Sequence, residues 1–298
     1  PIPASSKMKI LNFGSVNVDY VYGVDHFVKP SETLASQSFE VFMGGKGCNQ
    51  SVALAKAGAE VYHAGTIGKD GVWIKEQLEE WGVNTDFLHI TDGPTGHAII
   101  QVVPEGQNAI IIHGGANRTV TSEQIGQTLS RFAPGDLLLL QNEINGISEL
   151  IEAASEKGMK IAFNPAPMTL EVLLFPLDKI DVFIINEVEG QELTRQTSPV
   201  DILHVMATRF PNAATLLTLG EKGAVYSHQN IHTEVKAHSV KAIDTTAAGD
   251  TFIGYFLASQ ALGLPLEECL DNASKAAAIC VTRKGGAISI PDKKEVQK

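Results

Sequence analysis

Short apolar runs alternate with helical patterns along most of this chain, and this alternation constrains the fold more than any other feature. Six runs have the length and continuous hydrophobicity of buried strands, at residues 9–15, 61–68, 136–143, 160–166, 181–187 and 214–220. Helical patterns lie at residues 49–57, 70–81, 147–157, 169–175, 188–195 and 199–210, and two more helices are expected within 250–282. Such alternation is typical of an α/β fold with a mostly parallel sheet between helical layers.

Two stretches break this alternation, residues 16–43 and 94–116. Each contains β-like segments separated by turns, and "EGQN" between two apolar runs of the second stretch indicates a hairpin. We expect the two stretches to form one small sheet that stands on the α/β domain as a lid. The predicted boundaries are 17–43 and 94–116 for the lid, and 9–16, 44–93 and 117–298 for the α/β domain.

The chain is acidic, with 23 Lys and Arg residues, 34 Asp and Glu residues and a formal net charge of −11 over 298 residues. Because no run of basic residues is longer than two, as at Arg283-Lys284, we expect no nucleic-acid partner. Three scattered cysteines favour a reducing compartment, and a cytoplasmic protein is expected. No apolar run approaches the ~18 residues of a membrane span, so no membrane partner is expected. Residues 1–7 lack the apolar core of a signal peptide, and Met8 is expected to be the natural start.

Polar side chains follow several predicted strands at the point where each strand ends. They are Asn17, Asp19, Glu143, Asn164, Asn186, Glu189 and Thr218. Open α/β sheets bind ligands at the carboxyl ends of their strands. The sequence therefore predicts that a binding site lies at this edge of the sheet.

The common nucleotide-binding motifs GxxxxGK[ST] and GxGxxG are missing, as are HExxH, a Cys/His zinc set and GxSxG. Two other glycine-rich elements stand directly before helical patterns. In the first, "GGKGCNQ" (44–50), the glycines allow close backbone approach to a ligand, and Lys46 and Asn49 offer donors suited to hydroxyl groups. Taken alone, this element could equally be a plain glycine-rich turn.

The second glycine-rich element is "AIDTTAAGDTFIGYF" (242–256). Apolar residues recur at helical spacing through 252–261, and Gly263 stands where a helix would end. Residues 247–249 therefore lie at a helix N-terminus, where free N–H groups and the helix dipole favour an anion. Asp250 falls in the first turn, where its carboxylate could simply complement the dipole.

Together the two elements resemble the signatures of the ribokinase, or PfkB carbohydrate kinase, family. "FGSVNVD", "NPAP", "NEVE", "TLGEKG" and "VTRKGGAIS" occur in the family's order, so the resemblance covers nearly the whole chain. It implies a ribokinase-like three-layer αβα fold with a small β lid. It also implies a kinase that transfers the γ-phosphoryl group of ATP to a sugar hydroxymethyl group, with D-ribose the first candidate. Another small sugar, a sugar acid or a nucleoside is an alternative substrate, and a catalytically silent sugar-binding protein is an alternative class.

The resemblance assigns catalytic roles to four residues. Asp250 would take the proton from the attacking hydroxyl group. The backbone amides of Ala247, Ala248 and Gly249 would hold the charge that develops on the phosphates. Because a silent relative should have lost its base, the intact Gly249-Asp250 pair favours an active enzyme.

By the same resemblance, a second set of residues would hold the sugar: Asn17, Asp19, Gly45, Lys46, Asn49, Glu143 and Asp250. Carboxylates and amides suit this role because each can pair with two hydroxyl groups. From the residues alone, Glu143 could also be a strand-end carboxylate in a salt bridge. Asn17 and Asp19 could likewise form an Asx-type turn.

The nucleotide would contact a third set: Asn186, Thr218, Gly220, Lys222, Gly223, Gly249 and Ser274. Glu189 completes an NxxE pattern with Asn186 and, in the family, places Mg²⁺ near the phosphates through water molecules. The same two residues could instead be a helix-capping pair. Ser274 could simply be packed on its helix face.

Members of the family are also activated by a monovalent cation such as K⁺ beside the anion site. The matching positions are Asp244, Thr246, Cys280, Arg283, Gly285 and Ser289. Several of them would act through backbone carbonyl groups, so their side chains say little. Asp244 could instead be an ordinary turn residue before the helix.

The lid departs from the family pattern at "KPSETL" (29–34), where Ser31 replaces a glycine that would permit positive φ. Aromatic side chains near the lid, Tyr20, Tyr22 and Phe42, could serve a nucleoside base. Apolar residues alternate along the lid strands and predict a face through which two subunits pair into a homodimer, as in the family. These residues are Leu34, Phe39, Val41, Ile100 and Val102.

Overall fold

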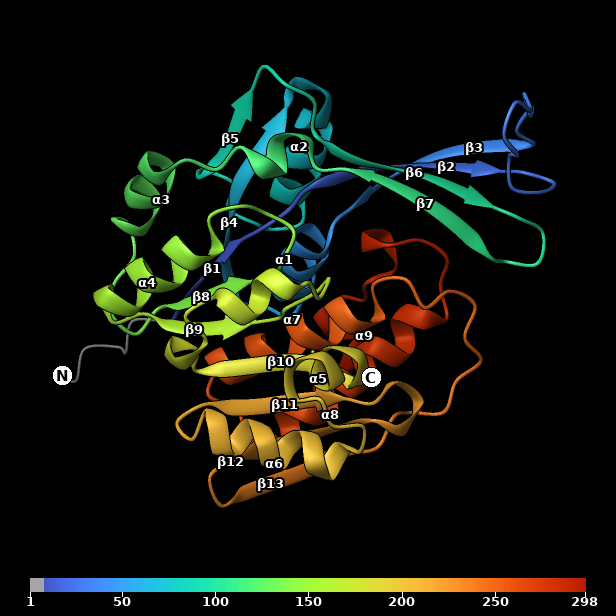
Figure 1. The fold of residues 1–298 in the computed structure, drawn as a ribbon. Helices are drawn as coiled ribbons and strands as arrows, with labels where there is room; N and C mark the ends of the chain where they lie inside the picture. The colour runs from blue at the N-terminus through green and yellow to red at the C-terminus, as the bar shows by residue number, and fades with distance from the viewer. Residues whose placement is uncertain (1–7) are drawn as a thin grey trace.

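The computed structural model describes residues 8–298, whose strands form a large and a small sheet (Figure 1). Residues 1–7, and with them the question of the natural start, lie outside the described residues. The large sheet contains β1 (Lys9–Phe13), β4 (Glu60–Gly68), β5 (Leu88–Thr91), β8 (Leu137–Leu140), β9 (Lys160–Phe163), β10 (Val182–Asn186), β11 (Ala214–Thr218), β12 (Ala224–His228) and β13 (Ile231–Val235). The small sheet contains β2 (Asn17–Gly23), β3 (Ser38–Gly44), β6 (Gly96–Val102) and β7 (Asn108–His113).

The large sheet has the order β13-β12-β11-β10-β9-β8-β1-β4-β5, and all its pairings from β11 to β5 are parallel. This confirms the predicted α/β class with a mostly parallel sheet. The sequence analysis missed the antiparallel hairpin β12–β13 at one edge. Its outer strand is mostly exposed, and so it lacks the continuous apolar run that marks a buried strand.

Two helical layers cover the sheet. One layer contains α1 (Lys46–Lys56), α2 (Val72–Glu80), α7 (Ala248–Ala261) and α8 (Leu266–Val281), whose apolar faces share one buried cluster. The other contains α3 (Ser122–Leu129), α4 (Ile147–Lys157), α5 (Glu187–Thr194) and α6 (Pro199–Arg209), which share a second cluster. A short α9 (Lys293–Val296) follows near the C-terminus.

The helix predicted at 169–175 is wrong. Residues Leu170–Leu174 form a 3₁₀ helix, and Phe175 is already extended with ψ 156°. Because Pro176 disfavours helical geometry in the residue before it, the segment cannot continue as an α-helix.

The small sheet has the order β3-β2-β6-β7 and projects from the α/β body, with its far end beyond the large sheet (Figure 1). A smaller sheet beside the main one was predicted, and the structure confirms it. Ser31 adopts φ 66° in the loop between β2 and β3, so the turn keeps a left-handed residue although the glycine is replaced. Such a conformation costs a non-glycine residue about 1 kcal/mol or more.

Helices α1 and α7 pack closely enough to bring their N-terminal turns together. A Cβ atom built on Gly254 of α7 would lie 2.3 Å from the Cβ of Ala53 in α1. Gly254 is therefore required for this close approach. The contact carries Asn49 and Gln50 of α1 to Asp250 of α7.

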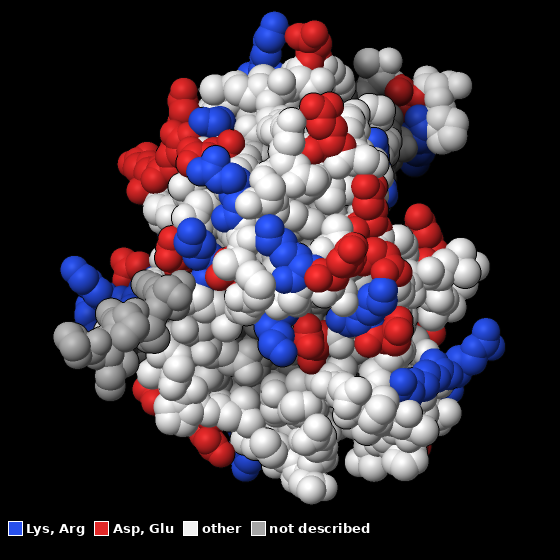
Figure 2. Space-filling view, turned by 90° about the vertical axis from the view of Figure 1, so that its left-hand side faces the viewer, with Lys and Arg blue, Asp and Glu red and all other residues white. Residues whose placement is uncertain are grey.

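Charged side chains are intermixed on the face that includes α3 and α4, where Lys and Arg lie among Asp and Glu (Figure 2). Within residues 8–298, none of the helices combines the length and apolar character needed to cross a membrane.

Candidate active site

The N-terminus of α1 is held against the end of β8 by the carboxylate of Glu143. Glu143 Oε1 accepts hydrogen bonds from the backbone N–H of Lys46 and from Ser15 Oγ, both at 2.7 Å. Ser15 Oγ in turn accepts from the N–H of Gly47 at 3.1 Å. Gly45 directly precedes α1 with φ 94°, a conformation that favours glycine. Glu143 therefore contacts the glycine-rich element, and no salt bridge of its side chain is seen among the described residues.

The N-terminus of α7 opens at Ala247, which has φ 65° and makes no side-chain cap. Ala248 donates its N–H to the carbonyl of Thr245 at 3.2 Å, so this amide is partly engaged. Gly249 is exposed, and a Cβ atom built on it would meet nothing within 4 Å. The start of α7 thus presents the uncovered helix end that the sequence predicts for an anion.

Asp250 lies buried in the first turn of α7, between two amide donors from α1. Asn49 Nδ2 donates to Asp250 Oδ2 at 3.1 Å, and Gln50 Nε2 donates to Asp250 Oδ1 at 2.9 Å. Both carboxylate oxygens are therefore fixed by side chains of a different helix. Each oxygen keeps a lone pair for a further proton or hydrogen bond.

Charged groups converge on Lys46. The negative charge of Asp250, more than any other group, raises the pKa of the Lys46 ammonium; burial opposes the shift, and Glu143 and Glu189 add to it. Burial, together with the charge of Glu143, raises the pKa of Asp19 to about 7. The structure thus brings two of the predicted sugar residues, Asp250 and Glu143, and the predicted Mg²⁺ residue Glu189 within electrostatic range of Lys46.

Asn17 begins β2 and is buried next to Asn117. Asn117 Nδ2 donates to Asn17 Oδ1 at 2.7 Å, and Asn117 also pairs with the backbone N–H and carbonyl of Val16. The Asx-type turn considered for Asn17 is not what engages its side chain here. Its Oδ1 is instead held by a residue from the segment that follows β7.

Asn186 and Glu189 form a complete capping box at the start of α5. Asn186 Oδ1 accepts from the N–H of Glu189 at 2.9 Å, and Glu189 Oε1 accepts from the N–H of Asn186 at 3.3 Å. Glu189 is buried, and burial raises the pKa of its carboxyl group. The capping alternative is therefore present, with one carboxylate oxygen of Glu189 still outside the cap.

Apart from Asn186 and Gly249, the predicted nucleotide residues lie at the end of β11, in the loop that follows it, and on α8. Thr218 ends β11, Gly220 and Lys222 bound a short 3₁₀ turn, and Gly223 follows with φ 97°. Gly223 is required by packing, because a Cβ atom there would lie 1.9 Å from the carbonyl oxygen of Val235. Ser274 on α8 donates to the carbonyl of Lys236 at 3.1 Å, so its side chain ties α8 to the segment after β13.

Two segments that are distant in sequence meet at the predicted cation site. Asp244 accepts from the N–H groups of Thr246 at 2.8 Å and Gly285 at 3.0 Å. Burial opposes the shift, but these hydrogen bonds hold the pKa of the Asp244 carboxyl below its ordinary value. Cys280 Sγ lies 3.6 Å from the carbonyl oxygen of Thr246 and 3.1 Å from Ser289 Oγ. Five of the six predicted cation positions thus form one network of contacts: Asp244, Thr246, Cys280, Gly285 and Ser289. The side chain of Arg283, the sixth position, lies outside this network.

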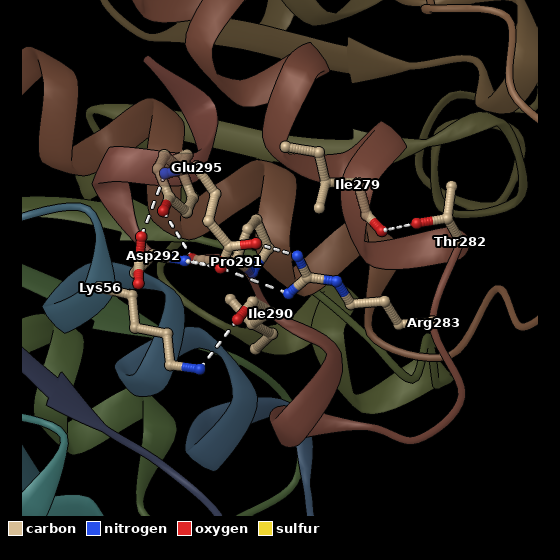
Figure 3. A network of polar contacts seen from close by, with 9 residues as sticks. Lys56, Ile279, Thr282, Arg283, Ile290, Pro291, Asp292 and Glu295 are labelled. Atoms are coloured by element: carbon tan, nitrogen blue, oxygen red, sulfur yellow. Dashed lines mark hydrogen bonds and ion pairs between the residues drawn. The ribbon is translucent and has the colours of Figure 1, made fainter. Parts of the chain in front are cut away.

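The side chain of Arg283 points toward Glu295 in the C-terminal segment (Figure 3). It forms an ion pair with Glu295, which also caps α9. Lys56 of α1 donates to the carbonyl of Ile290 at 2.8 Å in the same region. If Arg283 contributes to a cation site, it does so through its backbone.

The register of the small sheet decides which side chains share a face with Asp19. Asp19 pairs with Phe42 on β3 and with Ala98 on β6, and Ala98 pairs with Ile112 on β7. Paired residues point to the same side of a sheet, so Ala98 and Ile112 lie on the Asp19 face. Of the three aromatic residues considered for a nucleoside pocket, only Phe42 lies on this face; the others, Tyr20 and Tyr22, point to the opposite side.

The opposite face of the small sheet is apolar and partly exposed. Phe39 and Val41 lie there, at 53% and 42% exposure. The prediction that Ile100 and Val102 share this face is wrong, because Ile100 pairs with Val21 and therefore lies on the Asp19 side. Leu34 lies outside the strands.

Sequence reasoning missed several residues that position the site. They are Ser15, Gln50, Asn117 and Gln141, which hold Glu143, Asp250, Asn17 and Gln50 respectively. Gln50 follows Asn49 in the glycine-rich element, and that adjacency was the available signal. The others hold Glu143, Asn17 and Gln50 through contacts across 90 or more residues, which no local pattern reveals.

The chain is similar to known carbohydrate kinases in sequence and in structure. The chain matches the model of the pfkB family carbohydrate kinase over residues 7–293. It is 36% identical to a ribokinase of Haemophilus influenzae, covering 95% of each chain. A ribokinase of Cryptococcus neoformans var. grubii in complex with ADP superposes with a TM-score of 0.87 at 32% identity, covering 97% of this chain and 99% of the other. An Arabidopsis thaliana ribokinase complexed with ribose and ATP gives 0.86 at 30% identity, covering 97% of each.

Proposed function

We propose a reaction for this chain, which belongs to the pfkB family of carbohydrate kinases: it transfers the γ-phosphoryl group of ATP to the hydroxymethyl group of D-ribose, giving ribose 5-phosphate. The enzyme is a phosphotransferase that acts on a sugar hydroxyl group. The observation that carries the proposal is the buried Asp250 carboxylate, held between Asn49 and Gln50 beside the uncovered start of α7.

The residues support a direct transfer. The Asp250 carboxylate accepts the proton of the hydroxymethyl group as its oxygen attacks the γ-phosphorus, and the bond to the β-phosphate oxygen breaks to release ADP. A positioned base contributes about 10²–10⁴-fold to such a step. The exposed N–H of Gly249 and the positive end of the α7 dipole face the charge that develops on the phosphates.

Asn49 supplies a specific argument for a hydroxylated ligand. The residue is 6% exposed, and its Oδ1 has no hydrogen-bond partner among the described residues. Its Nδ2 is already committed to Asp250. A buried acceptor without a partner is costly, and a sugar hydroxyl group would supply the missing donor beside the base.

The sugar would be held from three sides. Asp19 and Asn17 approach from β2, Lys46 and Gly45 from the start of α1, and Glu143 from the end of β8. Ala98 and Ile112 lie on the Asp19 face of the small sheet, where they would form an apolar roof. We propose on this basis that residues 17–43 and 94–116 act as a lid over the sugar, with the α/β domain as predicted.

ATP would lie along Asn186, Thr218, Gly220, Lys222, Gly223 and Ser274, and the relatives bound to ADP or to ATP support this use of the nucleotide. The buried Glu189 carboxylate, whose capping bond uses one oxygen, fits Mg²⁺ held through water, where Mg²⁺ would neutralise phosphate charge. Asp244 and the carbonyl of Thr246 offer the oxygen ligands that suit K⁺.

The exposed apolar face with Phe39 and Val41 supports a homodimer formed through the small sheets. Three cysteines with free thiols are buried, which fits a reducing compartment such as the cytoplasm. Both points remain proposals. A mass of 31.9 kDa in light scattering at micromolar concentration would count against the dimer.

The test of the proposed function is ADP release with ATP and Mg²⁺ against a panel of sugars, sugar acids and nucleosides, with and without K⁺. We expect the highest turnover with D-ribose, raised by K⁺. Turnover on a different sugar would keep the mechanism and overturn the substrate. Binding of sugar and ATP without turnover on any member of the panel would favour a silent binding protein.

A further inference from the structure

We infer that Gln50 is a positioning residue for the base Asp250, and that a chain of buried amides anchored on two backbone carbonyls fixes its orientation. The inference rests on the proposed function, because it assigns to Gln50 an effect on that reaction. Gln50 is completely buried in the first half of α1. Its side chain makes three hydrogen bonds, all to buried side chains outside α1.

The first anchor lies at the carbonyl of Gly47. Asn12 Nδ2 donates to this carbonyl at 2.8 Å, so Asn12 Oδ1 must be an acceptor. Gln141 Nε2 donates to Asn12 Oδ1 at 3.0 Å and to Gln50 Oε1 at 2.7 Å. The carboxamide of Gln50 therefore presents its oxygen to Gln141 and its NH₂ group to Asp250.

The second anchor lies at the carbonyl of Ile184. Asn164 Nδ2 donates to it at 2.9 Å, which leaves Asn164 Oδ1 as an acceptor. Gln50 Nε2 donates to Asn164 Oδ1 at 3.1 Å and to Asp250 Oδ1 at 2.9 Å. Both anchors thus fix the same orientation of the Gln50 carboxamide. Its two N–H groups donate to Asn164 and Asp250.

This arrangement has a consequence for the base. A buried N–H donor stabilises the carboxylate form of Asp250 over the protonated form and restricts rotation of its side chain. The Asp250 carboxylate therefore points in one direction when the sugar hydroxyl group arrives. Asn49 holds the other oxygen and keeps its own Oδ1 without a partner, whereas Gln50 is completely buried and its amide is fully used by Asp250, Asn164 and Gln141.

The test compares Gln50→Met and Gln50→Glu with the wild type. Met keeps the unbranched shape without a donor, and Glu keeps the acceptor for Gln141 but places an acceptor against Asp250. We expect the acidic limb of the kcat–pH profile to move to higher pH by about one unit in Gln50→Met and further in Gln50→Glu. The KM for sugar, measured above that limb, should change by less than about threefold.

Gln124→Met is the matched control. Gln124 is also a buried glutamine and donates to the carbonyl of Gly65 at 2.8 Å, but it lies on α3. Gln124→Met should lose stability as the Gln50 variants do. The acidic limb of its kcat–pH profile, however, should stay at the same pH as in the wild type. The inference is overturned if the acidic limb of the kcat–pH profile moves in neither Gln50 variant. It is also overturned if this limb moves equally in Gln124→Met.

A second measurement separates this inference from the proposed function. The ¹³C signal of the Asp250 side-chain carboxyl group, followed by NMR against pH, reports the same stabilisation without turnover. The pH at the midpoint of this titration should rise in both Gln50 variants. If the wild type phosphorylates no sugar but the midpoint rises, the proposed function fails and the positioning role stands. If turnover is normal and the midpoint is unchanged in both Gln50 variants, the proposed function stands and the positioning role fails.

Discussion

On the sugar side of the site, side chains hold one another, whereas on the nucleotide and cation side the chain presents mainly backbone groups. Asp250, Asn49 and Glu143 each make hydrogen bonds to residues far away in sequence, and most of their surface is buried. Gly249 is exposed, Gly220 and Gly223 have positive φ, and Asp244 mainly orders a loop. Substitutions of side chains should therefore act strongly on the first side and weakly on the second, except at Gly223, which packing requires.

The largest effect is expected for Asp250→Ala. Loss of the base should reduce turnover by about 10²–10⁴-fold, whereas sugar affinity measured by calorimetry should fall by a much smaller factor. Asp201→Ala, at an exposed residue of α6, is the control and should keep full turnover. Residual activity above a tenth of the wild type would remove Asp250 from the role of base.

Glu143→Gln should have the next largest effect, and mainly on sugar binding. The substitution removes the charge that accepts from Ser15 and from the N–H of Lys46, and hydrogen bonds to charged groups contribute about 1.5–3 kcal/mol. We expect the KM for sugar to rise about 10- to 100-fold with a smaller change in kcat. An unchanged KM would mean that Glu143 only braces α1.

Asp19 should link sugar binding to pH and to stability. Its pKa of about 7 lies above the ordinary 3.8, so the folded state binds the proton more tightly than the unfolded state. Stability contributed by the protonated form is present below pH 3.8 and is lost as pH rises through 7.

Asp19→Asn should therefore stabilise the free enzyme by about 1–2 kcal/mol at pH 8 and not at pH 3.5, as thermal unfolding would show. In the wild type the KM for sugar should change with a midpoint near pH 7, and in the variant this change should disappear. Equal unfolding temperatures of the two proteins at pH 8 would contradict the burial that raises the pKa of Asp19.

The smallest effect is expected on the other side of the site, for Asp244→Asn. One of the two bonds to Thr246 and Gly285 is lost, together with the charge. Stimulation by K⁺, measured at constant ionic strength with choline chloride, should disappear, while turnover without K⁺ falls less than about threefold. If the variant responds to K⁺ like the wild type, the cation binds elsewhere or not at all.

The same contrast explains what the sequence could and could not predict. Most of the large sheet and the helices α1, α7 and α8 follow from apolar runs and helical spacing, because burial dictates those patterns. The edge hairpin β12–β13 was missed, and its outer strand β13, which is mostly exposed, carries little of that signal. The segment at 169–175 has helical spacing, but Pro176 prevents an α-helix.

Within the site, the glycine-rich elements identified Lys46, Asn49 and Asp250 because their chemistry is local in sequence. The residues that hold them in place could not be predicted in this way. Gln141 lies 91 residues from Gln50, and Asn117 lies 100 residues from Asn17. Such partners come together only when the chain folds. In the same way, only the register of the small sheet shows that Ile100 and Val41 lie on opposite faces.

The most direct test of the account is ³¹P NMR of the product formed from D-ribose, ATP and Mg²⁺, with wild type and Asp250→Ala side by side. We predict one phosphomonoester on the C5 hydroxymethyl group, formed in step with ADP by the wild type and at least a hundredfold more slowly by the variant. Inorganic phosphate as the only product, a phosphate on the anomeric hydroxyl group, or equal rates for the two proteins would contradict it.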